Sequence, residues 1–358
     1  TSLYEVYMKN YLLPQNGSFF KANMHCHSTL SDGKLTVEEI KALYKNAGYS
    51  IVAFTDHNVL IDHSDLADDG FMPITGYEYD VFDEKGDRSY NHTPLIHVCF
   101  YAKDQHNDVL PCYNANQISA RHADLREKQK YSGTPDYVRS YKNINETIAK
   151  TCSEGFLASL CHTTWSEQDL DEYRNIEGIF AMEILNYGCL TEGYNEINDH
   201  AYDDLCRRGK KIYCIASDDN HNNFPPDSPK FDSLGGFIMI KAPELEYSAI
   251  MKALENGDFY ASSGPEIYEM WTEGEELHIK TSPAARISLT TYGRRTSVCT
   301  GEKKGDLITE ATLACSGLYD RYCRVTVDDG QGHFAWTRAY FDCCKMENGR
   351  YDGVPFRK

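Results

Sequence analysis

The sequence lacks two features that would each place it in a common class of protein. It has no long uninterrupted apolar run, although 41% of its 358 residues are hydrophobic, so no membrane-spanning helix is expected. It also has no basic excess, because 36 lysines and arginines face 54 aspartates and glutamates, which gives a formal net charge of −18. Duplex DNA and RNA are bound through basic surfaces. We therefore expect neither a membrane nor duplex nucleic acid as a partner.

The sequence contains cysteine, but it shows neither a disulfide framework nor a Cys-x-x-Cys metal-binding motif. The 13 cysteines are odd in number and irregularly spaced, and several lie inside apolar runs. Such cysteines are typical of reduced protein cores, so we expect a reducing, cytoplasmic location. The first residue is Thr1 rather than Met, so an upstream segment is compatible with this sequence and the lack of a signal peptide says little about location.

From residue 18 to about residue 263 the chain repeats one pattern, an apolar run that ends in His, Asp or Glu. The segment Thr36-Val-Glu-Glu39 has the form of a capping box, and Gly48 ends the helical spacing that follows it. We expect strands at 18–24, 51–55, 72–77, 95–101, 156–161, 179–185, 211–216 and 236–240, and further helices near 145–153, 195–208 and 246–256. About seven or eight such units favour a parallel β/α barrel over an open sheet.

The pattern changes after Ser263-Gly-Pro265, where apolar and polar residues alternate over short runs between glycine-rich turns. This alternation predicts a small all-β sandwich. We therefore expect an α/β barrel domain over residues 1–263 and a β-sandwich domain over 264–358. Residues 103–142 show no barrel-like pattern and are expected to be an insertion, either a solvated excursion or a lid over the substrate.

His25 and His27 are the first candidates for metal ligands. Residues two apart in a strand point to the same side, so their imidazoles are expected to lie together. Asp32 follows in a polar turn, and the apolar runs further along the chain end in more residues of this kind. In Ser217-Asp-Asp-Asn-His221 we favour Asp219 over Asp218, because Asp-x-His keeps both side chains on one face.

Two further choices depend on the position of a residue in its strand. His97 is favoured over His92 because it lies within an apolar run. Cys26 and Cys161 adjoin candidate ligands, but neighbouring strand residues face opposite sides, so we expect both cysteines to fill the core.

Several motifs of the chain, in order, resemble those of the PHP (polymerase and histidinol phosphatase) family. They are His25-x-His27, Ser31-Asp32-Gly33, Thr55-Asp56-His57, Gly76-x-Glu78, His97, His162 and Asp219-x-His221. The similarity covers roughly residues 18–263, and the segment 234–265 also looks like its counterpart in stand-alone members. It implies a distorted (β/α)7 barrel that holds two or three divalent ions, and nitrogen and oxygen ligands without thiolate suit Zn, Mn or Fe.

The resemblance also implies which residues share an ion. One ion would take His25, His27, Glu78 and Asp219. A second would share Glu78 and add His97 and His162. A third would take Asp32, His57 and His221.

The activity implied is hydrolysis of a phosphate ester by a metal-bridging hydroxide. The substrate would be a small phosphorylated molecule, such as a metabolite, a nucleotide or a short oligonucleotide. Two alternatives remain open. One is an amidohydrolase-like reaction on a substrate without phosphate, and the other is a metal-binding module without catalysis.

Two residues outside the ligand set are candidates for catalysis. Asp56 is expected either to orient a histidine or to protonate the leaving group. Arg121 lies in the basic part of the insertion, and we hypothesise that it holds the substrate phosphate, because a planar guanidinium grips phosphate oxygens in two places.

Overall fold

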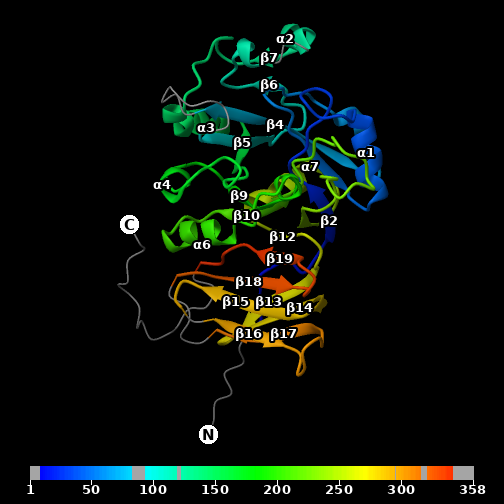
Figure 1. Cartoon of the computed structure of the whole chain (residues 1–358), viewed down its shortest axis with the longest axis vertical. Coiled ribbons are helices and arrows are strands. Elements are labelled where there is room, and N and C mark those ends of the chain that lie inside the picture. Colours follow the sequence, from blue (N-terminus) through cyan, green and yellow to red (C-terminus); the bar gives the residue numbers. More distant parts are fainter. Residues whose placement is uncertain (1–8, 83–92, 119–121, 295, 316–320, 342–358) are drawn as a thin grey trace.

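The computed structural model describes residues 9–82, 93–118, 122–294, 296–315 and 321–341. One mixed sheet of 13 strands runs through it, in the order β10-β9-β8-β5-β4-β3-β2-β11-β12-β19-β18-β15-β16 (Figure 1). In chain order these strands are β2 (Ser18–Asn23), β3 (Ile51–Phe54), β4 (Met72–Phe82), β5 (Leu95–Ala102), β8 (Phe156–Leu160), β9 (Ala181–Asn186), β10 (Tyr213–Ser217), β11 (Phe237–Ala242), β12 (Phe259–Ser262), β15 (Arg286–Thr291), β16 (Ser297–Thr300), β18 (Cys323–Asp328) and β19 (Phe334–Thr337).

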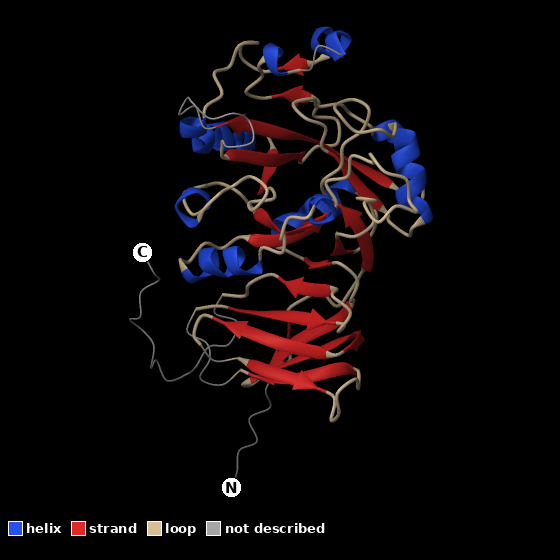
Figure 2. Cartoon of the chain, viewed as in Figure 1, coloured by secondary structure: helices blue, strands red, loops and turns tan. Residues whose placement is uncertain are grey.

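Helices are confined to one end of the molecule, as Figure 2 shows. They are α1 (Val37–Asn46), α2 (Ala123–Lys128), α3 (Ile144–Ser153), α4 (Leu170–Tyr173), α5 (Tyr187–Glu192), α6 (Asp199–Arg207) and α7 (Tyr247–Asn256). The capping box predicted for α1 is confirmed: Thr36 accepts from the backbone N–H of Glu39, whose side chain accepts from the N–H of Thr36. Ile40 and Tyr44 form the buried face of this helix. No helix in the described part of the chain is long and apolar enough to cross a membrane.

Every strand and helix expected in the α/β part occurs within a few residues of its predicted position. The predicted direction of some strands is wrong. β5 runs antiparallel to both β4 and β8, and β11 runs antiparallel to β2. The α/β class is thus confirmed, but the strand series is mixed rather than parallel. An apolar run shows only that a strand is buried on both faces. An antiparallel strand covered on both faces has the same pattern as a parallel one, so the run does not give the strand direction.

The C-terminal part is rich in β-structure, as expected. A second sheet has the order β1-β13-β14-β17 and consists of β1 (Asn10–Tyr11), β13 (Ile267–Glu273), β14 (Glu276–Ala284) and β17 (Ile308–Ala314). Leu277 and Ile279 of this sheet share a core with Ile287 and Val325 of the large sheet. The large sheet runs without interruption from β12 into β19. A domain boundary at residues 263–264 therefore stays a prediction.

A buried ion pair also joins the C-terminal strands to the α/β part. Arg324 of β18 is only 2% exposed, and its guanidinium donates two hydrogen bonds to Asp203 of α6, at 2.7 and 2.8 Å. Tyr322 donates to the same carboxylate. Two parallel N–H···O bonds give this contact a fixed geometry.

Candidate metal centre

Two chain segments lie side by side and bring three of the predicted ligands together. The N–H of Asp219 donates to the carbonyl of His25 at 2.9 Å, and the N–H of His27 donates to the carbonyl of Asn220 at 3.1 Å. The Nε2 atoms of His25 and His27 lie 3.2 Å apart. Asp219 Oδ1 is 3.2 Å from the first and 3.0 Å from the second. Asp219 adopts a positive φ of 51°, which is uncommon for an aspartate and typical of strained functional positions.

The neighbouring Asp218 points elsewhere. Its carboxylate accepts hydrogen bonds from the N–H groups of Leu234, Gly235 and Gly236 and from the hydroxyl of Tyr44. Burial raises the pKa of Asp218 to about 6 in spite of these donors. Asp219, not Asp218, therefore faces the candidate site, as the Asp-x-His spacing predicted.

Glu78 of β4 lies at the centre of the cluster. Its Oε1 is 2.8 Å from Nδ1 of His97. The same oxygen is 3.2 Å from Nε2 of His162 and 3.3 Å from Nε2 of His25. Its Oε2 is 3.1 Å from Nδ1 of His57 and 3.4 Å from Nε2 of His27. Five imidazole nitrogens thus approach one buried carboxylate from different strand ends.

The remaining predicted ligands form the more open side of the cluster. Asp32 Oδ2 lies 3.4 Å from Nε2 of His221 and 3.9 Å from Nε2 of His57. The Asp32 side chain is 44% exposed, whereas Glu78 is 1% exposed. All nine predicted ligands are therefore brought together, but metal binding by each of them stays a prediction.

The donor set fits divalent cations. Donor atoms within 4.8 Å of one another form four groups: His25, Glu78, Cys161 and His162; His27, Asp32, His57 and His221; His25, His27 and Asp219; and His57, Glu78 and His97. Nδ1 of His57 is buried and lacks a hydrogen-bond partner of good geometry in the described structure. A buried imidazole nitrogen without a hydrogen bond is better suited to coordinating a metal than to packing against apolar groups.

The electrostatics of the cluster agree with a cation site. Burial alone would lower the pKa of His25, but the carboxylates of Asp219 and Glu78 raise this pKa well above its usual value. His162 behaves in the same way and reaches a pKa of about 9. Burial tends to raise the pKa of Glu78, yet the surrounding histidines, His97 first, hold it well below its usual range. The metal-free cluster thus favours protons on His25 and His162, and divalent cations would replace these protons.

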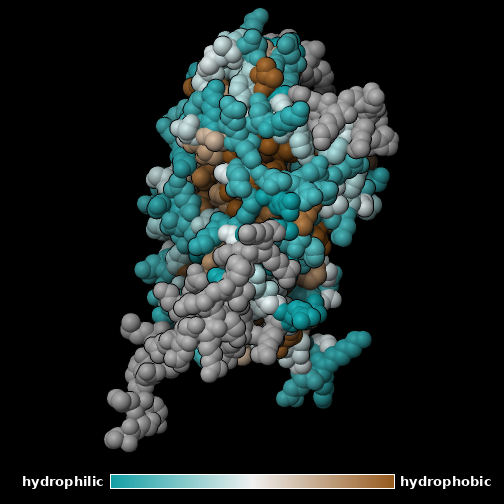
Figure 3. Space-filling view, turned by 90° about the vertical axis from the view of Figure 1, so that its left-hand side faces the viewer, coloured by the Kyte–Doolittle hydropathy of each residue, from teal (hydrophilic) through white to brown (hydrophobic). Residues whose placement is uncertain are grey.

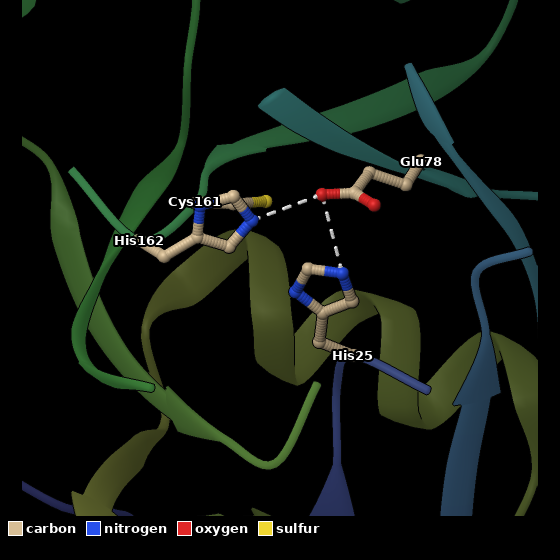
Figure 4. Close-up of side chains that lie close together, drawn as sticks. All are labelled: His25, Glu78, Cys161 and His162. Atoms are coloured by element: carbon tan, nitrogen blue, oxygen red, sulfur yellow. Dashed lines mark hydrogen bonds and ion pairs between the residues drawn. The ribbon is translucent and has the colours of Figure 1, made fainter. Parts of the chain in front are cut away.

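Cys161 departs from the prediction that it would face away from the site. Its sulfur belongs to the group with His25, Glu78 and His162 (Figure 4). β8 ends at Leu160, and His162 has a φ of 20°, so the strand alternation on which the prediction relied no longer applies at these residues.

Glu183 of β9 was missed by the motif analysis. Its Oε1 accepts from Nδ1 of His25 at 2.8 Å, and its Oε2 accepts from the backbone N–H of His162 at 2.8 Å. It therefore fixes the tautomer and orientation of His25, whose Nε2 faces the site. The available signal was a single carboxylate inside an otherwise apolar strand, because a buried charge requires partners.

We expect Glu183→Gln to weaken metal affinity by roughly 10- to 100-fold, because a neutral amide supports the His25 imidazole less well than a carboxylate. Titration of the metal-free protein with Zn would measure this change. Glu196→Gln is the matched control, since Glu196 is a buried glutamate that binds the N–H groups of Thr164 and Trp165. A similar loss in both variants would contradict the role of Glu183.

The structure shows the surroundings of Asp56, whose catalytic role stays a prediction. Its carboxylate accepts hydrogen bonds from the N–H and hydroxyl groups of Ser28 and of Ser31 at 2.7 to 3.1 Å. It is 2% exposed and does not line the cavity described below. Asp56 therefore holds the loop between His27 and Asp32 and does not orient a histidine directly.

Arg121 and His92 lie outside the described residues, so the role of Arg121 stays a prediction. Another arginine of the insertion does reach the neighbourhood of the cluster. Arg139 is 8% exposed, donates to the side-chain oxygen of Asn58, and lies 4.1 Å above the ring of Tyr79. Asn58 directly follows His57, so the insertion supports the loop that carries this histidine.

A cavity of about 650 Å³ opens above the cluster. Seven of the nine predicted ligands line it, all except His25 and His27, which lie deeper. Its walls also include Asp80, Trp165, Phe224 and Lys230, none of which the motifs indicated. Lys230 is the one lysine or arginine among the described lining residues.

Residues 23–213 match the family model of the PHP domain. Among curated proteins, DNA polymerase III subunit alpha of Campylobacter jejuni is 26% identical over 236 residues. This match covers 58% of the present chain but 18% of the polymerase subunit, so the chain spans less than a fifth of that relative.

Two solved structures show weak similarity. A two-domain protein from Bacteroides vulgatus that contains a predicted PHP-like metal-dependent phosphoesterase matches with a TM-score of 0.44 and 14% identity, over 93% of this chain and 97% of its own. An amidohydrolase from Chromobacterium violaceum, with bound sulfate and no metal, matches with a TM-score of 0.37 and 16% identity, over 57% and 92%. Both TM-scores are below 0.5, so the assignment rests on the sequence match. The PHP family model matches residues 23–213, which is more than half of the 358 residues, so this chain belongs to the PHP domain family.

Proposed function

We propose that this protein hydrolyses a phosphate ester of a small phosphorylated molecule, using two or three divalent ions of Zn, Mn or Fe. The observation that carries the proposal is the position of Glu78. Its buried carboxylate is surrounded by five imidazole nitrogens at the bottom of an open cavity. A carboxylate in this environment is suited to bridging two cations.

The residues divide among the ions as the family resemblance implies. His25, His27, Glu78 and Asp219 would hold one ion. Glu78, His97 and His162 would hold a second, and Asp32, His57 and His221 a third. The chemistry that such ions supply is activation of water and neutralisation of the charge that develops on phosphoryl oxygens.

The protein's own contribution is to fix the donors in place and to shape the cavity. Nδ1 of His162 is hydrogen-bonded to the hydroxyl of Ser166 at 3.0 Å, so its Nε2 is free to face Glu78. Trp165 packs edge-on against both His97 and His162, with ring centroids 5.5 and 4.9 Å away. This indole shields one side of the cluster from water, which strengthens electrostatic interactions there.

The size and charge of the cavity support a small anionic substrate. A volume of about 650 Å³ suits a metabolite, a nucleotide or the end of a short oligonucleotide. The chain carries −18 overall, so attraction for an anion must come from the bound cations and from local groups such as Lys230. The same charge disfavours a duplex as substrate.

We also propose that the strands of the α/β part close into the distorted seven-stranded barrel that is implied by the family resemblance. The parallel bridge between Cys26 and Asn220 supports this, because it places the segment after β2 against the segment after β10. Seven strands lie in sheet order from β10 to β2.

The proposed reaction can be tested with p-nitrophenyl phosphate. We expect phosphate release by protein supplied with Mn, Zn or Fe in turn, loss of the activity after chelation, and recovery on adding the ion back. A p-nitroanilide substrate assayed in parallel addresses the alternative amidohydrolase-like reaction. Cleavage of the anilide alone would favour that alternative. Metal binding without either activity, followed by no activity on a panel of phosphorylated metabolites, would favour the non-catalytic module.

A further inference from the structure

The motif-based ligand set does not account for the thiol of Cys161. This side chain is fully buried, and the cysteine is free of disulfides. Figure 4 shows its sulfur beside the imidazole of His162, close to the Glu78 oxygen that His162 and His25 also approach. All four donor atoms lie within 4.8 Å of one another.

The hydrogen bonds of Cys161 are weak. Its thiol donates to the carbonyl of Ser159 at 3.7 Å and is hydrogen-bonded to the thiol of Cys99, and thiols are weak donors and acceptors. The other three members of the group, by contrast, are two imidazoles and a carboxylate that face one another. A tetrahedral ion held by nitrogen, oxygen and sulfur donors would satisfy all four side chains.

We propose that Cys161 is a metal ligand and binds, as a thiolate, an ion held jointly by His25, Glu78 and His162, in place of the division above that gives His25 and His162 to two different ions. This inference rests on the proposed function, because it requires a cation in the cluster. On coordination the thiol proton leaves to solvent and the sulfur lone pair forms the bond to the ion, so no oxidant or reductant takes part.

The thiolate would form only when the ion is present. A divalent cation deprotonates a coordinating thiol outright. A sulfur ligand also shifts selectivity away from hard ions such as Mn and towards softer ones such as Zn.

Cobalt(II) is the probe that tests this inference, because thiolate ligation produces a charge-transfer band in the near ultraviolet that nitrogen and oxygen ligands do not give. We expect this band, together with weak visible bands, when the metal-free full-length protein is loaded with Co(II). The near-ultraviolet band should be lost in Cys161→Ser, whereas the visible bands should remain. The preference of the protein for Zn over Mn should also decrease in the same variant.

Cys99→Ser is the matched control. Cys99 is a second fully buried thiol that is hydrogen-bonded to Cys161 and pairs with Glu78 across the β4–β5 ladder, but it belongs to none of the four donor groups. The near-ultraviolet band should persist in this variant, and its loss there alone would assign the ligand to Cys99 and overturn the proposal.

The cobalt spectrum of the wild-type protein distinguishes a failure of thiolate ligation from a failure of the metal centre. Visible cobalt bands without the near-ultraviolet band would overturn thiolate ligation and leave the metal centre intact. Failure of the wild-type protein to bind cobalt, zinc or manganese would overturn the metal centre itself.

Discussion

Glu78→Gln should lower kcat/KM for p-nitrophenyl phosphate by at least about 10³-fold, or roughly 4 kcal/mol of transition-state stabilisation. Glu78 lies within 3.4 Å of five of the predicted histidine ligands. An amide keeps the shape of the side chain but removes the negative charge, so two ions would lose a shared ligand. Steady-state kinetics should be combined with elemental analysis of the same sample, which we expect to show depleted metal.

Asp32→Asn is the matched control for this change, because Asp32 is also a predicted carboxylate ligand. It is 44% exposed and lies within 4 Å of three histidines, His27, His57 and His221, but it is assigned to a single ion. We therefore expect Asp32→Asn to lose less metal than Glu78→Gln. Equal losses of metal in the two variants would show that Glu78 does not bridge.

Arg324→Met should lower the free energy of unfolding by about 3–5 kcal/mol, because it leaves the Asp203 carboxylate buried without its cation. Asp203 is 7% exposed and accepts two hydrogen bonds from the guanidinium. Denaturant unfolding followed by circular dichroism would measure the change. Metal content at low denaturant should stay unchanged, since Arg324 belongs to none of the four donor groups.

Lys280→Met is the control for Arg324→Met. Lys280 forms an ion pair with Glu269 at 2.8 Å within the C-terminal sheet, but both side chains are exposed. Such pairs contribute about 0–1 kcal/mol, so little change is expected. If the two variants lost the same stability, the buried pair would not be what joins β18 to α6.

The sequence contained enough information for the strand ends and most of the site. Capping residues and apolar runs are local signals, and His25, Glu78 and His162 each stand at or near the end of such a run. The direction of β5 was not predictable in this way, because pairing depends on contacts between distant segments. The partners of Asp56 were not predictable for a related reason, since Ser28 and Ser31 lie about 25 residues earlier in the chain.

Domain organisation illustrates the same limit. The described residues after 263 contain no helix, in line with the change of pattern there, but this pattern does not show that β12 pairs with β19 or that Arg324 reaches Asp203. A chain cut after residue 265 would lose both contacts. Whether residues 1–263 fold and act alone therefore depends on how well the exposed edge of β12 and the unpaired Asp203 are tolerated.

The ratio of metal to protein tests the central claim most directly. Protein purified without chelators, reconstituted with Zn, Mn or Fe and freed of excess ion should contain two to three divalent ions per chain by elemental analysis. Fewer than one ion per chain after reconstitution with each of these metals would contradict the assignment of His25, His27, Asp32, His57, Glu78, His97, His162, Asp219 and His221 as a metal centre.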